Sequence, residues 1–301
     1  MLTGSQVALP TPFKDGDVDE AALRFLVSTN IEGGTSGLLV LGTTGEAPTL
    51  TDEEHRRVIK LVVDTAAKRV PVLAGCGTNS TRKAIDYAEQ AKAVGADAIL
   101  VVTPYYNKPS QEGLYRHFRA ISEAVDIPMV MYNHPGRCVI ELAIETVTRL
   151  AKLRNVIGMK DSNPSITRLI NLRLALGNDF LLVSGDEPTG LAYMAYGGNT
   201  QFNTIGSAVP REMAEIHAAW DAGDPKQARE LYTKVMPLAL AMYVESNPVP
   251  LKYMLSLLGK CTPEVRLPLC ELSDASKAVV QKAVATVGLV PATRQPVLQR
   301  A

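Results

Sequence analysis

The sequence predicts an α/β barrel with a helical C-terminal extension, and three observations support this fold class. Over the first three quarters of the 301 residues, short aliphatic or β-branched runs alternate with longer amphipathic stretches. Eight such runs occur, and no GxGxxG turn follows any of them, which disfavours an open nucleotide-binding sheet. From Pro210 onward only helical patterns follow. We therefore predict a (β/α)8 TIM barrel over residues 1–224 and a helical extension over residues 225–301.

The strand candidates are short and bounded by turn residues. In chain order they are Gln6–Thr11, Gly37–Gly42, Val70–Cys76, Ala98–Thr103, Pro128–Asn133, Val156–Asp161, Phe180–Ser184 and Asn199–Ile205. Helical periodicity predicts the segments between and after them. These are Asp19–Gly33, Thr51–Lys68, Ser80–Gly95, Gln111–Val125, Ala143–Lys152, Ile166–Leu176, Thr189–Tyr196, Arg211–Asp221, Pro225–Tyr243, Val249–Leu258 and Ser273–Val287.

Several helix boundaries carry their own signals. Thr51 followed by Glu54 is typical of a capping box, and Ser80 precedes the next helix. Glycines mark four helix ends, as expected for left-handed C-terminal caps. They are Gly33-Gly34, Gly95, Gly177 and Gly197-Gly198. Residues 291–301 are expected to form a loose tail.

Composition and charge narrow the classes of function. Thirty-one basic residues balance 31 acidic ones, so no global field draws the chain to nucleic acid or to an anionic membrane. No apolar run reaches the ~18–20 residues of a membrane span, and no signal-peptide pattern opens the sequence. The four cysteines and four histidines show no CxxC or HExxH spacing. We expect a cytoplasmic protein without metal or cofactor that binds neither nucleic acid nor membrane.

Lys160 closes the apolar run 156–159. Alternation along a strand predicts that Val156, Gly158 and Lys160 share one face, with Gly158 leaving room beside the amine. Burial disfavours the ammonium form, and a neutral amine can attack a carbonyl to form a Schiff base. Judged by this segment alone, a strand-end lysine more often reaches solvent. The other strand ends decide between the two interpretations.

Polar residues follow several other strands at the barrel face where TIM-barrel active sites lie. Thr43 and Thr44 lie in a glycine-flanked turn that suits a small carboxylate, although threonine equally caps helices. Tyr132 should project to the barrel lining, where a phenol can move protons. Arg137 offers a planar fork for a carboxylate, and a surface arginine fits this position equally well.

Together these groups predict a site for a 2-oxo acid. A lysine condenses with the ketone, threonines and an arginine bind carboxylates, and a tyrosine moves protons. The loops after the seventh and eighth strands, Gly185–Glu187 and Gly206–Ala208, lack the basic residue that a phosphorylated substrate would favour.

Over nearly its whole length the chain resembles the dihydrodipicolinate synthase family, in the N-acetylneuraminate lyase superfamily of pyruvate-dependent class I aldolases. The matching motifs are Gly42-Thr43-Thr44-Gly45-Glu46, Thr103-Pro104-Tyr105-Tyr106-Asn107-Lys108-Pro109, Tyr132-Asn133-x-Pro135-x-Arg137, Gly158-x-Lys160, Ser184-Gly185-Asp186, Asn247-Pro248-x-Pro250-x-Lys252 and Arg266-x-Pro268. The Tyr-Tyr-Asn-Lys-Pro and Asn-Pro-x-Pro-x-Lys runs are more similar to the synthase branch than to the sialic acid lyase branch.

The resemblance implies a Schiff base between Lys160 and pyruvate, whose enamine attacks aspartate 4-semialdehyde in lysine and diaminopimelate biosynthesis. It implies that Tyr132 is the principal proton carrier, linked through Thr43 to Tyr106 of a neighbouring subunit. A residue borrowed across an interface requires at least a dimer. The family is commonly a tetramer of two tight dimers, so we expect a homotetramer.

The same resemblance implies the substrate-binding residues. Thr44 would bind the carboxylate of pyruvate and Arg137 that of the semialdehyde, while Phe202 and Gly185 would lie beside the substrates. The family usually has an isoleucine where this chain has Phe202, between the polar Gln201 and Asn203. Residues 161–163 and His134 are also atypical. These departures leave open a pyruvate-dependent aldolase or lyase for another 2-oxo acid, and a noncatalytic barrel ranks far below both enzymes.

Lysine inhibits some relatives by binding at the dimer interface, at a histidine, an asparagine, a glutamate and a tyrosine. His55, Asn79 and Tyr105 match three of these positions, and Lys83 occupies the place of the glutamate. A cation there would repel the ammonium group of a bound lysine. We therefore expect the enzyme to be insensitive to lysine.

Overall fold

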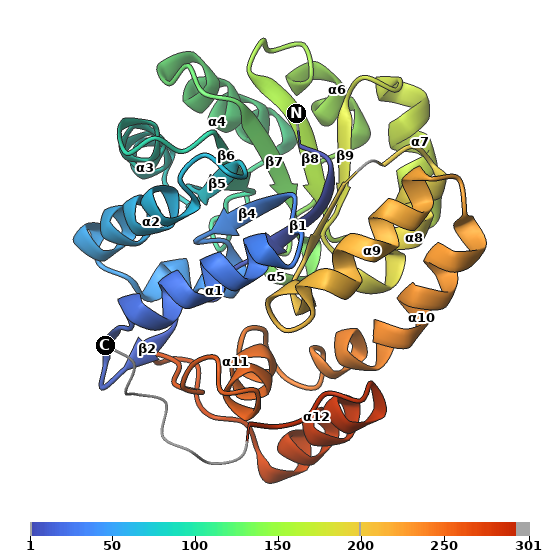
Figure 1. Ribbon diagram of the computed structural model, residues 1–301. Helices are drawn as coiled ribbons and strands as arrows, with labels where there is room; N and C mark the ends of the chain where they lie inside the picture. Colours follow the sequence, from blue (N-terminus) through green and yellow to red (C-terminus); the bar gives the residue numbers. More distant parts are fainter. Residues whose placement is uncertain (1, 199, 293–301) are drawn as a thin grey trace.

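The computed structural model describes residues 2–198 and 200–292, and its centre is a closed parallel barrel surrounded by helices (Figure 1). The strands neighbour one another in the order β1-β10-β9-β8-β7-β6-β5-β4, and β4 pairs with β1. Their bounds are β1 Gly4–Ala8, β4 Gly37–Val40, β5 Val72–Gly75, β6 Ala98–Val102, β7 Met129–Asn133, β8 Val156–Asp161, β9 Leu181–Ser184 and β10 Thr200–Asn203. The predicted barrel is confirmed, and every strand lies within its predicted run except β1, which starts earlier. Asn199, where the eighth predicted run begins, is outside the described residues.

Helices cover the outside of the barrel and form the extension. They are α1 Glu20–Glu32, α2 Asp52–Ala66, α3 Thr81–Ala93, α4 Gln111–Ala124, α5 Pro135–Cys138, α6 Ile144–Leu150, α7 Ile166–Leu176, α8 Gly190–Ala195, α9 Pro210–Asp221, α10 Pro225–Ala241, α11 Val249–Leu257 and α12 Asp274–Thr286. Helix α5 and the hairpin of β2 (Phe13–Lys14) and β3 (Asp17–Val18) were not predicted, because each is too short to show a period.

The boundary signals act as the sequence suggests at most helix ends. The Thr51 hydroxyl accepts from the Glu54 amide at 3.2 Å, and the Thr51 amide donates to the Glu54 carboxylate at 2.9 Å, which completes the capping box of α2. Gly95 has φ of 92°, the left-handed conformation that glycine adopts without strain. At the end of α1 the left-handed residue is Gly34, whereas Gly33 remains helical with φ of −76°.

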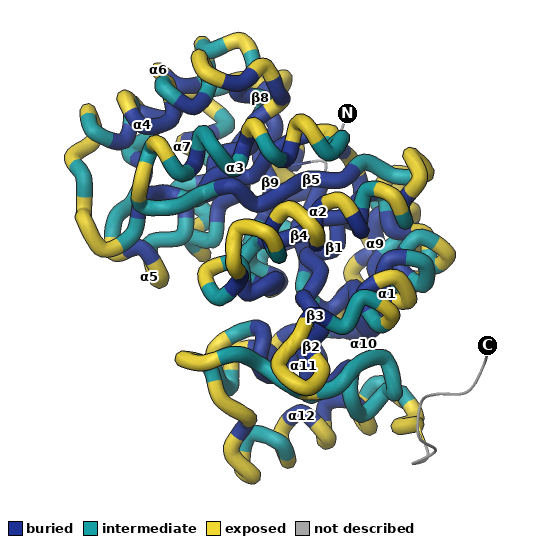
Figure 2. Tube along the Cα trace, turned by 90° about the vertical axis from the view of Figure 1, so that its left-hand side faces the viewer, coloured by how far each residue is buried: buried dark blue, intermediate teal, exposed yellow. Residues whose placement is uncertain are grey.

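Apolar side chains form two layers of core. One cluster fills the barrel, with Leu39, Leu100, Val130, Val183 and Phe202 among its members. A larger cluster joins the outer faces of the strands to the helices. Figure 2 shows the result, with buried strands at the centre and the exposed parts of the chain on the helices and loops around them.

The C-terminal extension is joined to the barrel by a buried ion pair. Lys252 on α11 is 0% exposed, and its Nζ lies 2.5 Å from Oε1 of Glu46, the last residue of the turn after β4. The amine also donates to the Glu264 carbonyl at 2.8 Å and lies 4.0 Å from the centre of the Phe13 ring. Figure 1 shows α11 and α12 together at one edge of the molecule. The division between residues 224 and 225 stays a prediction.

A second ion pair between the extension and the barrel gives a pH-dependent contribution to stability. The Arg266 guanidinium donates to both oxygens of Glu54, at 2.6 and 2.7 Å, and this lowers the pKa of Glu54 from 4.5 to about 2. Because the pKa of Glu54 is lower in the folded protein than in the unfolded chain, the ion pair stabilises the fold at pH values above about 4.5. This stabilisation is lost as the pH falls toward 2 and the carboxyl becomes protonated.

We expect Glu54→Gln to lower the free energy of unfolding by about 1–2 kcal/mol at pH 7, with a difference that shrinks steadily below pH ~4.5. Glutamine can still complete the capping box, so the change mainly tests the charge. Urea unfolding at several pH values measures it, with Glu53→Gln at the adjacent exposed position as control. A difference that is the same at pH 7 and pH 3 would contradict the ion-pair explanation.

Candidate active site

A cavity of about 540 Å³ lies at the carboxyl ends of the strands, between the barrel and the segment that follows α10. Strand ends and βα loops provide most of its wall, and residues 242–247 provide the remainder. The lining residues are Thr43, Thr44, Tyr132, His134, Gly136, Arg137, Lys160, Gly185, Glu187, Thr204, Met242, Tyr243, Glu245, Ser246 and Asn247. Six of the eight residues predicted for the site are among them.

Lys160 is buried at the end of β8, with 6% of its surface exposed. It pairs in register with Tyr132 of β7, and its Nζ lies 4.4 Å from the centre of the Tyr132 ring and 5.6 Å from that of Phe202. The amine therefore opens on the cavity between two aromatic rings. The alternative, a lysine that reaches bulk solvent, is wrong.

The prediction about the neighbours of Lys160 needs two corrections. The register of β8 shifts beside Met129 and Val130, so Val156 packs in the outer core and Ile157 against the inner cluster. Gly158 does face inward with Lys160, but a Cβ there would lie 2.6 Å from Leu181, so this glycine makes room for the next strand.

Gly185, after β9, is the glycine that makes room for the amine. A Cβ at Gly185 would lie 2.8 Å from Cε of Lys160 and 3.0 Å from its Cγ. The first distance is shorter than real Cβ contacts and the second is tighter than most of them, so a side chain at this position would displace the lysine. The glycine predicted beside the substrates thus shapes the path of the lysine side chain.

Both predicted carboxylate-binding groups contact a residue of the extension. Asn247 donates from Nδ2 to Oγ1 of Thr44 at 2.9 Å, and the backbone carbonyl of Asn247 accepts from the Arg137 guanidinium at 3.3 Å. Thr44 is buried in the 3-10 turn Thr43–Gly45, while Arg137 on α5 is exposed at the wall of the cavity. Arg137 therefore faces the site, and the two groups share one wall.

Two predicted residues do not line the cavity of their own chain. Phe202 is 2% exposed and packs in the inner cluster behind Lys160. Tyr106 is 90% exposed and has φ of 72°. Its phenol projects from the surface of the chain, so its predicted place in the proton relay stays a prediction that needs a neighbouring subunit.

The polar residues on either side of Phe202 have hydrogen-bond partners. Gln201 donates from Nε2 to the Tyr232 hydroxyl on α10 at 3.1 Å. Asn203 donates to Oγ of Ser5 on β1 at 2.9 Å, and its Oδ1 accepts from the Gly206 amide at 2.9 Å. Both side chains thus have structural partners, although the buried Oε1 of Gln201 has none among the described residues, and Phe202 is the departure on this strand that lies beside the lysine.

The site also contains titratable groups that were not assigned from the sequence. Glu187 is buried, and burial raises the pKa of its carboxyl, which accepts from the Thr204 amide at 2.5 Å. Burial, aided by the charges of Arg137 and Lys160, lowers the pKa of His134 to about 4. The imidazole is therefore neutral at pH 7. Glu187 and His134 each follow a barrel strand closely in the sequence, and this position at the end of a strand is the signal from which both could have been assigned to the site.

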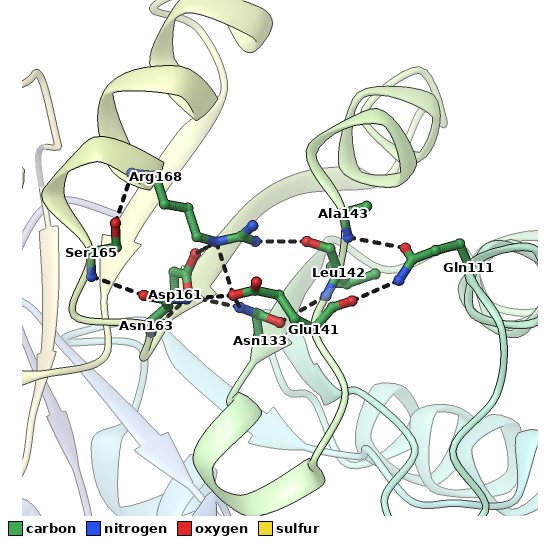
Figure 3. Close-up of polar contacts among 9 residues, drawn as sticks. All are labelled: Gln111, Asn133, Glu141, Leu142, Ala143, Asp161, Asn163, Ser165 and Arg168. Atoms are coloured by element: carbon green, nitrogen blue, oxygen red, sulfur yellow. Dashed lines mark hydrogen bonds and ion pairs between the residues drawn. The ribbon is translucent and has the colours of Figure 1, made fainter.

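A polar network holds the segment that follows Lys160 (Figure 3). Asp161 is 1% exposed and accepts from the Arg168 guanidinium at 2.8 Å, from the Asn133 amide group at 2.9 Å and from the Asn163 backbone amide at 2.9 Å. The Arg168 guanidinium also donates to the Leu142 carbonyl at 2.8 Å. These bonds join the ends of β7 and β8 to α7, so the segment that follows Lys160 in the sequence is held in place.

Within residues 2–198 and 200–292, no three histidine, cysteine, aspartate or glutamate residues gather as metal ligands. In the same part of the chain, no helix combines the length and apolar character needed to cross a bilayer.

Fold and site define a class: a (β/α)8-barrel enzyme whose cavity presents a buried lysine amine beside a tyrosine. A family model for the dihydrodipicolinate synthetase family matches residues 1–287, so the chain belongs to this family. The 4-hydroxy-tetrahydrodipicolinate synthase of Bradyrhizobium diazoefficiens is 47% identical over 95% of this chain and 97% of its own.

Solved structures agree. The dihydrodipicolinate synthase of Aquifex aeolicus superposes with a TM-score of 0.95 at 41% identity, over 97% of this chain and 100% of its own. The chloride-inhibited enzyme of Acinetobacter baumannii, solved as a complex with pyruvate, superposes with a TM-score of 0.94 at 42% identity, over 96% and 100% of the two chains. The family and the fold expected from the sequence are both confirmed.

Proposed function

We propose that the protein is a 4-hydroxy-tetrahydrodipicolinate synthase that condenses pyruvate with L-aspartate 4-semialdehyde. The observation that carries this proposal is the buried amine of Lys160, which opens on a cavity 4.4 Å from the Tyr132 ring and shares it with Thr44 and Arg137. The curated relatives carry this enzyme's name, and a structural neighbour is a complex with pyruvate.

The reaction begins when the Lys160 amine adds to the ketone carbon of pyruvate and water leaves, which gives an iminium. Loss of a proton from the methyl carbon gives an enamine, and this carbon attacks the aldehyde carbon of the semialdehyde. Tyr132 gives a proton to the new alkoxide and receives protons at other steps. The amine of the bound semialdehyde then displaces lysine from the imine carbon and closes the ring, so one water is released overall.

The remaining residues bind and orient the substrates. Thr44, buried and held by Asn247, offers its hydroxyl and the backbone of its turn to the pyruvate carboxylate. Arg137 at the wall of the cavity binds the carboxylate of the semialdehyde through its planar fork. Thr43 lines the cavity beside Thr44 and links Tyr132 to a partner's phenol.

We place the enzyme in lysine and diaminopimelate biosynthesis, as a cytoplasmic homotetramer of two tight dimers. The feature that supports an oligomer is Tyr106, which is 90% exposed and is not among the residues that line the cavity of its own chain. A phenol in the site of a neighbouring subunit completes the proton relay that Thr43 begins.

The other candidate is a pyruvate-dependent aldolase for a different aldehyde, and Phe202 is the observation that favours it. Its ring, 5.6 Å from the Lys160 amine, is larger than the family's isoleucine. A coupled assay with pyruvate and a panel of aldehydes separates the two. We expect the highest kcat/KM with aspartate semialdehyde, and a higher value with another aldehyde would overturn this assignment.

Lysine is expected to leave the activity unchanged. The Lys83 ammonium forms an ion pair with Asp52 and lies 4.8 Å above the Tyr87 ring, which stacks on His55 at 4.0 Å. A lysine ligand would bring a second cation to this place. Initial rates with 0–10 mM lysine measure the effect, and half-inhibition below about 1 mM would contradict the prediction.

A further inference from the structure

Ser162 joins three strand ends beside the proposed reaction centre. Its backbone amide donates to the Asn133 carbonyl at the end of β7 at 2.9 Å. Its Oγ lies 2.9 Å from the Gly185 carbonyl after β9 and 3.4 Å from the hydroxyl of Tyr132. Ser162 is not among the residues that line the cavity, so it reaches the reaction through the tyrosine.

The surroundings of Ser162 hold its hydroxyl in this place. On one side, Asp161 is fixed by the network of Figure 3, in which Arg168 and Asn133 both donate to its carboxylate. On the other side, a Cβ at Gly185 would collide with Oγ of Ser162. The glycine therefore leaves room for both the lysine and this hydroxyl.

The hydrogen-bonding capacity of a serine suits a group that both gives and takes protons. A hydroxyl has one proton and two lone pairs, whereas the Gly185 carbonyl can only accept. While Ser162 donates to that carbonyl, its lone pairs can accept from the neutral Tyr132 phenol. After the phenol has given up its proton, the hydroxyl can rotate and donate to the phenolate oxygen.

We propose that Ser162 is a positioning residue that holds the Tyr132 hydroxyl in place through both of its protonation states. This role rests on the proposed function, in which Tyr132 moves protons. It also gives a reason for the unusual serine that follows the Lys160-Asp161 pair. Among the described residues, Ser162 is the side chain hydrogen-bonded to this phenol, and Thr43 lines the same cavity.

A double-mutant cycle tests the role of Ser162. We expect Ser162→Ala to lower kcat by about 3–10-fold, the effect of one hydrogen bond, with little change in the KM for pyruvate. In a Tyr132→Phe background the same substitution should change kcat less than 2-fold, because the hydroxyl on which Ser162 acts is gone. Ser256→Ala is the matched control, since the Ser256 hydroxyl donates to the Tyr253 carbonyl on α11 at 2.7 Å.

The outcomes separate the two levels of the proposal. An equal loss of kcat in both backgrounds would show a merely structural role for Ser162, and unchanged kcat in the single variant would also overturn the inference. If the wild-type protein fails to turn over pyruvate with the semialdehyde, the proposed function itself is wrong. Thermal unfolding of each variant checks that a loss of kcat does not reflect a loss of fold.

Discussion

Replacing Lys160 by alanine is expected to remove the covalent pyruvate adduct and to lower turnover by at least about 10³-fold. The amine is the nucleophile in the proposed mechanism, and it lies 6% exposed beside the Tyr132 and Phe202 rings. Among the described residues no other lysine lines the cavity, so none is placed to replace Lys160 as the nucleophile.

Intact mass after borohydride reduction with pyruvate measures this effect directly. Wild-type protein should gain the mass of one reduced pyruvate adduct, and Lys160→Ala should gain none. Lys152→Ala changes an exposed lysine near the end of α6 and should behave as wild type. Adduct formation by Lys160→Ala to the wild-type extent would exclude Lys160 as the Schiff-base residue.

Replacing Lys252 by methionine is expected to lower the free energy of unfolding by about 3–5 kcal/mol. The side chains of Lys252 and Glu46 are 0% and 1% exposed, so the variant would leave a carboxylate buried without its cation. The large cost is that of the unpaired charge. The double variant with Glu46→Gln removes this charge and should recover a substantial part of the stability.

Urea unfolding measures this loss of stability, and an exposed lysine–aspartate ion pair on the surface provides the control. Lys60 and Asp64 lie 2.7 Å apart with side chains 60% and 51% exposed, and Lys60→Met should cost less than about 1 kcal/mol. A loss below about 1 kcal/mol for Lys252→Met would show that water, or the Arg266 backbone amide that donates to Glu46 at 3.1 Å, stabilises the carboxylate without the lysine.

The barrel could be predicted from the sequence because each strand and helix is encoded locally. The residues of the run 156–161 and their immediate neighbours are enough to predict where this strand begins and ends. In the same way, Thr51 and Glu54 mark the start of α2 without reference to the rest of the fold. The inward direction of Tyr132 and Lys160 follows from alternation within single strands. These predictions use only short-range information.

What the sequence could not predict depends on contacts between distant segments. The strand pattern assigns to Gly158 the room beside the lysine, but the pairing of β8 with β9 places Leu181 against Gly158, and Gly185 has that role. Asn247 reaches Thr44 across 203 positions of sequence. The hydroxyl beside the Tyr132 phenol belongs to Ser162, which a strand pattern cannot show.

The contacts of Asn247 connect the C-terminal extension to one kind of group in the site and not to the other. The amine and the phenol belong to barrel strands, whereas the two groups proposed to grip carboxylates are both tethered to a residue that follows α10. A change at residue 247 should therefore alter the positions of Thr44 and Arg137 while leaving the amine and the phenol in place. We expect substitutions around residues 242–247 to change which substrate carboxylates fit the cavity, because these residues form the part of the wall that does not come from the strand ends and βα loops and do not hold Lys160 or Tyr132.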